Sequence, residues 1–448
     1  MRNDGGKQSV PLMKVPALIS LGLFVFSIPA IYYNETLSFR WFPQVMAILM
    51  LLTNLHNLRF RQLHRSILCL VAIWGWLLLG TLGLDDPSIM DPLSVFTKYV
   101  AVAVALSLIV RTRTQLLVVL AAIAIAAIYI AYASHGQILG ARRQLSSDVM
   151  SGRISSEART SGVFLNENQF GMFGVSAIVA GITLFLARPK VSTAALGIGS
   201  TVCGGYLAYY SGSRKAIIGI GLSALFIMWM GLQRRKRFRA IVLMAALTIG
   251  AAVALVIYNS PYSRRFNVHE ESFQQRLLLL DQAASAWATS PFFGLGYHQF
   301  QKANILGLYS HSTPVEMLCT GGLVALALYA GLWWGIFKSL RFCLAAEKGK
   351  VGHNLLYGTA CYLMIEGINS LFSVTIEGQL WLVVIACFCG YLRSRELVLR
   401  DSHAPEAQGR KHFGLRRAGI ELRRQQTPAL SDMPRPVVNR DQAHRVAS

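Results

Sequence analysis

Residues 310–337 read SHSTPVEMLCTGGLVALALYAGLWWGIF, a polar start followed by an apolar run of about 20 residues, long enough to cross a bilayer. Thr313 can cap this helix, with Pro314 at its first position and Glu316 at its third, as in a capping box. The pattern favours a structural role for Glu316 and leaves catalysis as the alternative. Such runs recur along the chain, so we expect an all-α, polytopic integral membrane protein.

The composition agrees with this fold class. Of the 448 residues, 54% are hydrophobic and 14% charged, unlike an ordinary soluble domain. The hydropathy pattern predicts about twelve transmembrane spans. They begin near Val15, Trp41, Ile67, Pro92, Gln115, Gln169, Thr193, Ala216, Ala240, Pro314, Asn354 and Glu377. We therefore expect an N-terminal segment over residues 1–14, a membrane domain over 15–392 and a basic, disordered tail over 393–448.

Arginine and lysine gather in every second loop, and by the positive-inside rule those loops are cytoplasmic. Both termini then lie in the cytoplasm, and the long loops over residues 134–168 and 259–313 face outward, to the periplasm. The net charge of +22 mostly reflects this topology and the tail, which suits contact with anionic membrane lipids. It does not indicate binding to nucleic acid.

Several arginines lie in outward loops, against the bias that keeps cations inside. They are Arg142, Arg143, Arg153, Arg159, Arg214, Arg264, Arg265 and Arg276. The guanidinium group matches phosphate oxygens in a bidentate way, so these residues point to a phosphate-bearing ligand at the outer interface. The alternative is that long loops tolerate charge on either side.

Three of these arginines have the best positions for such a ligand. Arg159 precedes the sixth span, and Arg214 ends the short hairpin Ser211-Gly212-Ser213-Arg214. Arg276 lies on a helix expected over residues 272–289, whose apolar stripe predicts that it rests in the interface plane. The stripe consists of Phe273, Leu277, Leu280, Ala284, Trp287 and Ala288.

His311 lies just before the N-terminus of the span that begins at Pro314. The helix dipole there favours an anion nearby and a neutral imidazole, which can act as a general base. His298 is the competing base. Either histidine could instead be only a polar side chain of an interfacial loop.

Two charges fall inside predicted spans, where ionisable residues are functional by default. Lys98 lies about two turns from the outer end of the fourth span, from which it could reach the interface. Glu366 lies in the eleventh span, where it could line a polar cavity or pair with Lys98.

With these residues in place, the chain resembles the O-antigen ligase and polymerase superfamily. The resemblance rests on four pieces that occur in order on one side of the membrane. They are Arg159-x-x-Gly162-x-Phe164 with Asn166 and Asn168, Ser211-Gly212-Ser213-Arg214, Arg276 before Pro291-x-x-Gly294-x-Gly296, and His311-Ser312 followed by Gly322.

The resemblance implies a GT-C-like glycosyltransferase of a bacterial inner membrane, with an undecaprenyl-diphosphate-linked oligosaccharide as donor and neither cofactor nor metal. Arg214 and Arg276, with Arg159, would hold the diphosphate, and His311 would activate the acceptor hydroxyl. The acceptor would be a glycan or the lipid A core. A flippase and a chain-length regulator are the protein partners that such enzymes would have.

Three functions remain open at this stage. The first is polymerisation of O-antigen or exopolysaccharide repeat units, and the second is ligation of the glycan to lipid A core or to a protein hydroxyl. In ligases the histidine motif commonly continues with a second glycine three residues after the first, whereas Leu323, Val324 and Ala325 follow Gly322 here. This departure favours a polymerase. The third function, from another class, is the transport of a solute or anion.

Overall fold

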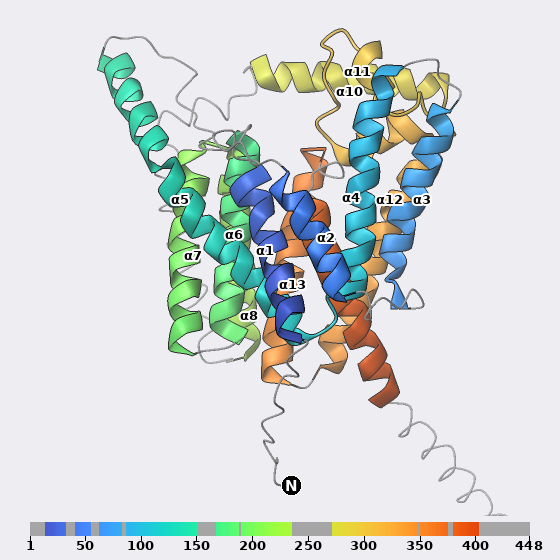
Figure 1. The fold of residues 1–448 in the computed structure, drawn as a ribbon. Helices are drawn as coiled ribbons and strands as arrows, with labels where there is room; N and C mark the ends of the chain where they lie inside the picture. Colours follow the sequence, from blue (N-terminus) through green and yellow to red (C-terminus); the bar gives the residue numbers. More distant parts are fainter. Residues whose placement is uncertain are drawn as a thin grey trace, which may run out of the picture. The chain divides into compact units, whose positions relative to one another are not determined.

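The computed structural model describes residues 14–32, 41–54, 62–82, 87–150, 167–187, 190–234, 271–347, 349–374 and 380–402. Side chains are not described at some of these, including residues 141–150, 226–234, 271–273 and Arg214. The described part is built of helices joined by turns and short loops (Figure 1). The prediction of an all-α membrane protein is confirmed.

The N-terminal half contains α1 (Lys14–Ser27), the π-helix η1 (Ile28–Tyr32), α2 (Phe42–Asn54), α3 (Arg65–Thr81), the short 3-10 helix η4 (Pro87–Ile89), α4 (Met90–Ile109) and α5 (Arg113–Met150). It is followed by α6 (Glu167–Ala187), α7 (Val191–Tyr210), α8 (Arg214–Arg234), α10 (Glu271–Thr289), α11 (Gln299–Ala303), α12 (Thr313–Ala346) and α13 (Lys350–Leu371). Residues 380–402 are also helical.

Five of the described helices are long and apolar enough to cross a membrane: α4, residues 113–140 of α5, α6, α7 and α12. Four further helical segments are apolar but shorter, including Arg65–Thr81 and Lys215–Leu225. The span expected near Ala240 lies outside the described residues. A polytopic membrane protein is thus supported, and the count of about twelve stays a prediction.

Two predicted boundaries shift in the structure. The periplasmic loop expected from residue 134 begins with helix, because α5 continues to Met150, and its 38 residues make it about 57 Å long. The tail expected from residue 393 also begins with helix, through residue 402. The chain divides into two units, Met1–Glu396 and Leu397–Ser448.

Glycines let α6 and α7 approach closely. A Cβ on Gly174 would lie 2.6 Å from the carbonyl oxygen of Gly204, and one on Gly181 would lie 2.5 Å from that of Gly197. Ser200 adds a 2.8 Å hydrogen bond to the carbonyl of Ala177. Such small-residue contacts replace the hydrophobic effect as the driving force for packing inside a membrane, and here they hold α7 against α6.

Two of the basic loops predicted to share one side, those before α5 and after α12, meet at one end of the helices. Arg113, at the start of α5, lies 3.1 Å from the Glu347 carboxylate that follows α12. Arg395 donates to the same carboxylate. The hydrogen bonds and charges from these two arginines and the Gly349 N–H lower the pKa of Glu347, although burial alone would raise it.

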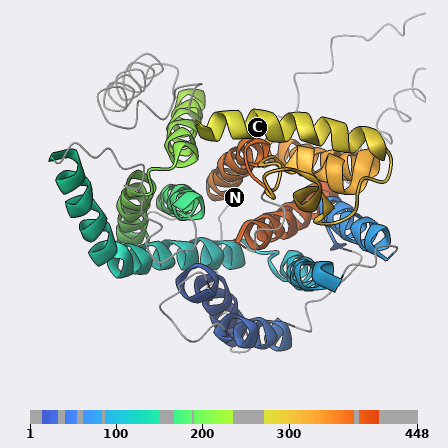
Figure 2. The same ribbon diagram turned by 90° about the horizontal axis from the view of Figure 1, so that it is seen from above.

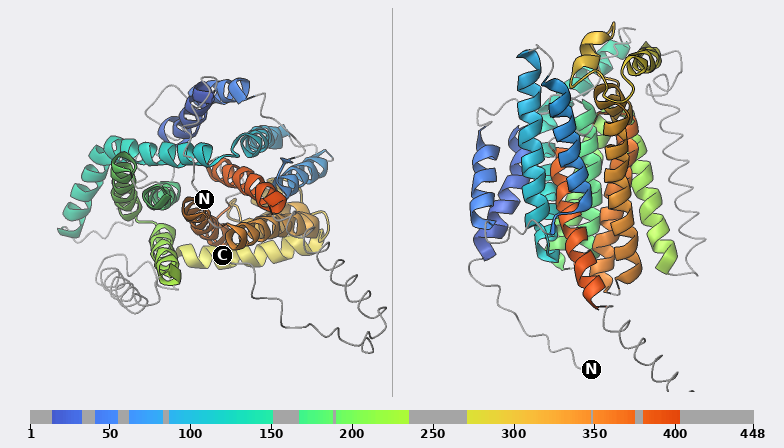
Figure 3. Two further views of the ribbon diagram at one scale, coloured as in Figure 1. Left: turned by 90° about the horizontal axis from the view of Figure 1, so that it is seen from below. Right: turned by 90° about the vertical axis from the view of Figure 1, so that its right-hand side faces the viewer.

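Helix α10 lies across the other end of the long helices (Figures 1 and 3). Viewed from above, it runs alongside α12 (Figure 2). Its side chains Leu279 and Ala283 are buried against Phe300 and Cys319. The apolar stripe read from the sequence is a different face, because Leu277 and Leu280 are 46% and 43% exposed. The helix therefore has two apolar faces: Leu279 and Ala283 pack on the protein, and the stripe predicted to rest in the membrane interface is exposed.

Candidate active site

His311 lies in a tight turn immediately before α12. Its φ is 59°, in the left-handed region that few residues other than glycine adopt. The backbone N–H and the hydroxyl of Thr313 both donate to the carbonyl of Ser373, beyond the end of α13, at 3.1 Å and 2.6 Å. The imidazole packs on Tyr309, with ring centroids 4.4 Å apart. The histidine is thus fixed by a contact between two elements 60 residues apart.

The predicted capping box at this helix start is wrong. Ser312, and not Thr313, is the N-cap, and its side chain makes no capping hydrogen bond; the Thr313 hydroxyl is bound to Ser373 instead. Glu316 is buried, and its carboxylate accepts from the N–H of Ser310 at 2.8 Å. This hydrogen bond ties Glu316 to the turn before His311, which agrees with a structural role.

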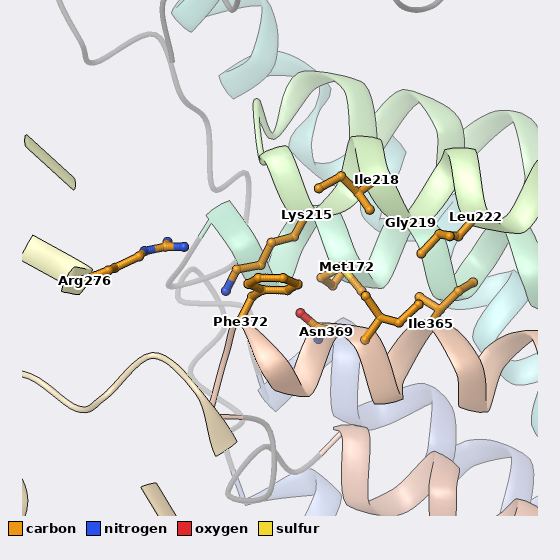
Figure 4. Close-up of a pocket in the computed structure, with 10 residues that line it drawn as sticks. Met172, Lys215, Ile218, Gly219, Leu222, Arg276, Ile365, Asn369 and Phe372 are labelled. Carbon is orange, nitrogen blue, oxygen red and sulfur yellow. The ribbon is translucent and has the colours of Figure 1, made fainter. Parts of the chain in front are cut away.

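Two cations lie close to His311. Lys215 belongs to the first turn of α8, and its ammonium group donates to the hydroxyl of Ser373, the residue that also holds Thr313. Arg276 comes from α10 and is half-buried. Figure 4 shows their charged ends pointing toward each other from separate elements.

These groups change the protonation of the histidine. Burial lowers the pKa of His311 to about 4, with further contributions from the charges of Arg276 and Lys215. The imidazole is therefore neutral at pH 7, as the sequence predicts. Burial and the two neighbouring cations lower the pKa of His311, whereas the sequence suggested the helix dipole as the cause.

A pocket opens behind the two cations (Figure 4). Its lining is mostly apolar, and Lys215, Arg276 and Asn369 are its three polar members. The other members are Met172, Ile218, Gly219, Leu222, Ile365, Ile368 and Phe372. A positively charged mouth on an apolar interior suits an amphiphilic anion, which would place its charge at Lys215 and Arg276 and its chain among the aliphatic side chains.

The hairpin that starts α8 packs on the start of α6. Gly212 has a φ of 60°, and the Ser213 hydroxyl donates to the side-chain oxygen of Asn168 at 2.8 Å. Gly171 faces the same hairpin, since a Cβ there would lie 2.4 Å from the Ser211 hydroxyl. Two of the motifs read from the sequence thus meet in space, and their contact orients the first turn of α8.

The other residues predicted for the site do not line this pocket or lie outside the residues that the structure describes. Arg214 begins α8, but its side chain is not described, and Arg159 lies outside the described residues. Lys98 is exposed on α4. His298 contacts Gln301 of its own short helix, with 3.2 Å between the polar atoms. Glu366 is buried in α13, where Asn369 and not Lys98 is its hydrogen-bond partner at 3.3 Å.

Helix α10, which carries Arg276, is joined through the loop that follows it to a kink in α12, the helix that begins after His311. Gly322 has non-helical backbone angles, with φ 65°, so the helical hydrogen bonds are interrupted there. The loop after α10 replaces them: Leu295 and Gly296 donate to the carbonyls of Cys319 and Thr320 at 2.7 Å and 3.0 Å, and Leu323 donates to that of Pro291 at 2.9 Å. The glycine motif that follows Arg276 and the glycine that follows His311 are therefore two halves of one joint.

Sequence reasoning missed Lys215 and Asn369. Lys215 was visible next to Arg214, but only the fold shows that the second of these two cations enters the pocket. Asn369 lies three residues after Glu366, one helical turn away, so the pair could have been read as one polar face in an apolar span.

Within the described residues, no group of three or more histidine, cysteine, aspartate or glutamate side chains is placed to hold a metal ion.

Comparison with known proteins places the site in a family context. Residues 199–330 match the model of the family described as O-antigen ligase. The chain is also 24% identical over 282 residues to the teichuronic acid biosynthesis protein TuaE of Bacillus subtilis (strain 168). That match covers 56% of this chain and 56% of the relative, so the chain spans about half the length of the curated relative it matches. The family match contains Lys215, Arg276 and His311.

Proposed function

We propose that this chain is a member of the O-antigen ligase and polymerase superfamily and that it transfers a glycan from a polyprenyl diphosphate to an acceptor hydroxyl. The donor would be undecaprenyl-diphosphate-linked, and the reaction would take place at the periplasmic face of the inner membrane. One observation carries the proposal: a neutral histidine faces two cations at the mouth of an apolar pocket.

The chemistry follows from the placement of these groups. The acceptor oxygen attacks the anomeric carbon, and the bond from that carbon to the diphosphate oxygen breaks. The acceptor proton passes to the neutral imidazole of His311, and the bond electrons leave with the diphosphate. Arg276 and Lys215 stabilise that departing charge. Because a bound diphosphate offsets the two cations that lower the pKa of His311, donor binding also makes the imidazole a stronger base.

We propose polymerisation of repeat units over ligation to lipid A core. The relative is named for teichuronic acid biosynthesis, and the Leu323-Val324-Ala325 continuation after Gly322 departs from the ligase pattern. The transporter alternative has no comparable support, since the family match covers the residues of the site.

Arg276→Ala tests the function directly. Loss of a charge-assisted hydrogen bond costs about 1.5–3 kcal/mol, so donor binding is expected to weaken by about 10- to 150-fold. In a deletion strain, the complementing variant should fail to restore surface polysaccharide at normal membrane levels of the protein. Accumulated lipid-linked glycan of single-repeat size would identify a polymerase, and long lipid-linked chains would identify a ligase.

The matched control is Asp281→Ala, which also changes one charge on the exposed side of α10. It should restore polysaccharide fully. Full restoration by Arg276→Ala would remove Arg276 from the site, and solute uptake that survives His311→Ala would favour the transporter.

The acid side of the pH profile gives an independent test. The base form of His311 is lost as pH falls through its pKa, so kcat/KM should fall toward about pH 4 in the wild type. Lys215→Met removes a positive charge that lowers this pKa, so the acid limb should move to higher pH. Lys302→Met, at a lysine whose ammonium donates to Ser88, should leave the limb in place. An unchanged acid limb in Lys215→Met would mean that the charge of Lys215 does not affect the pKa of the catalytic base.

A further inference from the structure

Asn369 is the uncharged polar residue of the pocket. It lies on α13 between the cationic mouth and the aliphatic interior, next to Phe372 and Met172 (Figure 4). A ligand with a charged head and an apolar chain would pass this amide at the junction of its two parts. The orientation of the amide therefore decides whether it offers the ligand a donor or an acceptor.

One orientation leaves an unfavourable contact. With Nδ2 donating to Glu366 at 3.3 Å, the Oδ1 atom of Asn369 is buried without a hydrogen-bond partner. A buried polar atom in that state destabilises the protein by about the cost of its desolvation. The reversed amide has nearly the same shape, since oxygen and nitrogen are similar in size, and it exchanges the two atoms.

The surroundings of Glu366 determine which orientation is favourable. The side chain is buried, and Tyr362 and Asn369, both uncharged, are its hydrogen-bond partners. An isolated ionised carboxylate in such a place is strongly disfavoured, and the group takes its neutral form instead. A neutral carboxyl group has an O–H to donate, and the reversed amide presents Oδ1 to receive it.

We propose that Asn369, oriented by a neutral Glu366, donates its Nδ2 amide to the phosphate oxygens of the polyprenyl diphosphate. The reversed amide gives Oδ1 a partner and places Nδ2 where Figure 4 shows the oxygen, on the side of Phe372. The buried atom that still needs a partner is then a donor. Asn369 is then a third anion-binding residue, and Glu366 is a positioning residue. The inference rests on the proposed function, because it assumes that the diphosphate occupies this pocket.

An uncharged donor suits this depth. A third cation below Lys215 would be exposed to the apolar interior, where a charge is costly, whereas an amide adds a hydrogen bond without adding charge. The amide would also distinguish a diphosphate head, which accepts hydrogen bonds, from the hydroxyl of a free polyprenol, which the two cations bind weakly. Glu366 then has a positioning role that does not require the pairing with Lys98 considered from the sequence.

The test measures binding by the full-length protein in lipid nanodiscs. The probes are undecaprenyl diphosphate and, as its uncharged match, undecaprenol. Asn369→Leu keeps the side-chain shape and Asn369→Asp replaces the donor by an acceptor; both should weaken diphosphate binding about tenfold or more. Glu366→Gln can still donate to Oδ1 and should stay within about threefold of wild type, whereas Glu366→Leu should lose about tenfold.

Each result has one meaning. Wild-type binding of the diphosphate by Asn369→Asp or Asn369→Leu, or equal losses in Glu366→Gln and Glu366→Leu, would overturn the role of the pair. The proposed function fails separately, if wild type does not prefer the diphosphate to undecaprenol or if Arg276→Ala binds it normally. Melting temperatures near that of wild type confirm that a loss of binding is not a loss of folding, and Asn369→Asp keeps the test open if the leucine variant does not fold.

Discussion

Replacement of His311 by asparagine is expected to lower kcat by about 10²- to 10⁴-fold, the usual contribution of a positioned general base. Asparagine is the informative substitution because the residue has a φ of 59°. Asparagine tolerates the left-handed region, whereas alanine would add strain to the turn. The loss should appear in kcat, since the donor is held by Lys215 and Arg276 and its affinity should change little.

The measurement is product formation by the purified protein with a lipid-linked donor, together with donor binding. His298→Asn is the matched control, because His298 has the same φ of 59° and also lies in a turn before a helix. It should retain most of its activity. If His298→Asn is inactive and His311→Asn is active, the two histidines exchange roles, and the base lies beside α11.

Gly322→Ala is expected to destabilise the protein by at least about 3 kcal/mol. A Cβ at this position would lie 2.2 Å from the carbonyl oxygen of Phe292 and 2.7 Å from the amide nitrogen of Phe293. Both atoms belong to backbone that is held by hydrogen bonds across the kink, so neither can move away freely. The positive φ of 65° adds strain for any residue with a Cβ.

Gly331→Ala is the control for this prediction, because it lies in the same helix and its Cβ would make only an ordinary contact with Cys69 at 3.5 Å. Thermal unfolding and size-exclusion profiles of the two purified variants give the comparison. Gly322→Ala should yield little folded protein or a clearly lower Tm, and Gly331→Ala should resemble wild type. Equal stability of both would mean that the loop after α10 does not pack into the kink.

A substitution that weakens the contact between the α10 loop and the kink should also lower catalytic activity. Arg276 lies on the helix before the loop, and His311 lies at the start of the kinked helix. Trp76 adds a hydrogen bond at 2.8 Å to the Gly321 carbonyl, which binds α3 to the same point. Weakening this joint should change the separation of the base from the cations before it unfolds the protein.

The sequence alone determined the class of fold, and it predicted the side of the membrane for the chemistry and singled out His311 and Arg276. Its information is local: apolar runs of spanning length, the alternation of basic loops, and the turn residues before Pro314. A histidine at a helix start and an arginine on an interfacial helix are visible in such patterns, because each depends on only a few neighbouring residues.

The tertiary structure decided which groups meet. Ser373 binds both Thr313 and Lys215, and this contact brings residues from α8, α12 and the end of α13 to one point. No period or spacing encodes that meeting, because it depends on how the helices pack. The same holds for the pKa of His311, which burial and the charges of Arg276 and Lys215 lower together. Burial and long-range Coulomb interactions are properties of the packed helices, so the chemistry of the site appears only when the chain is folded.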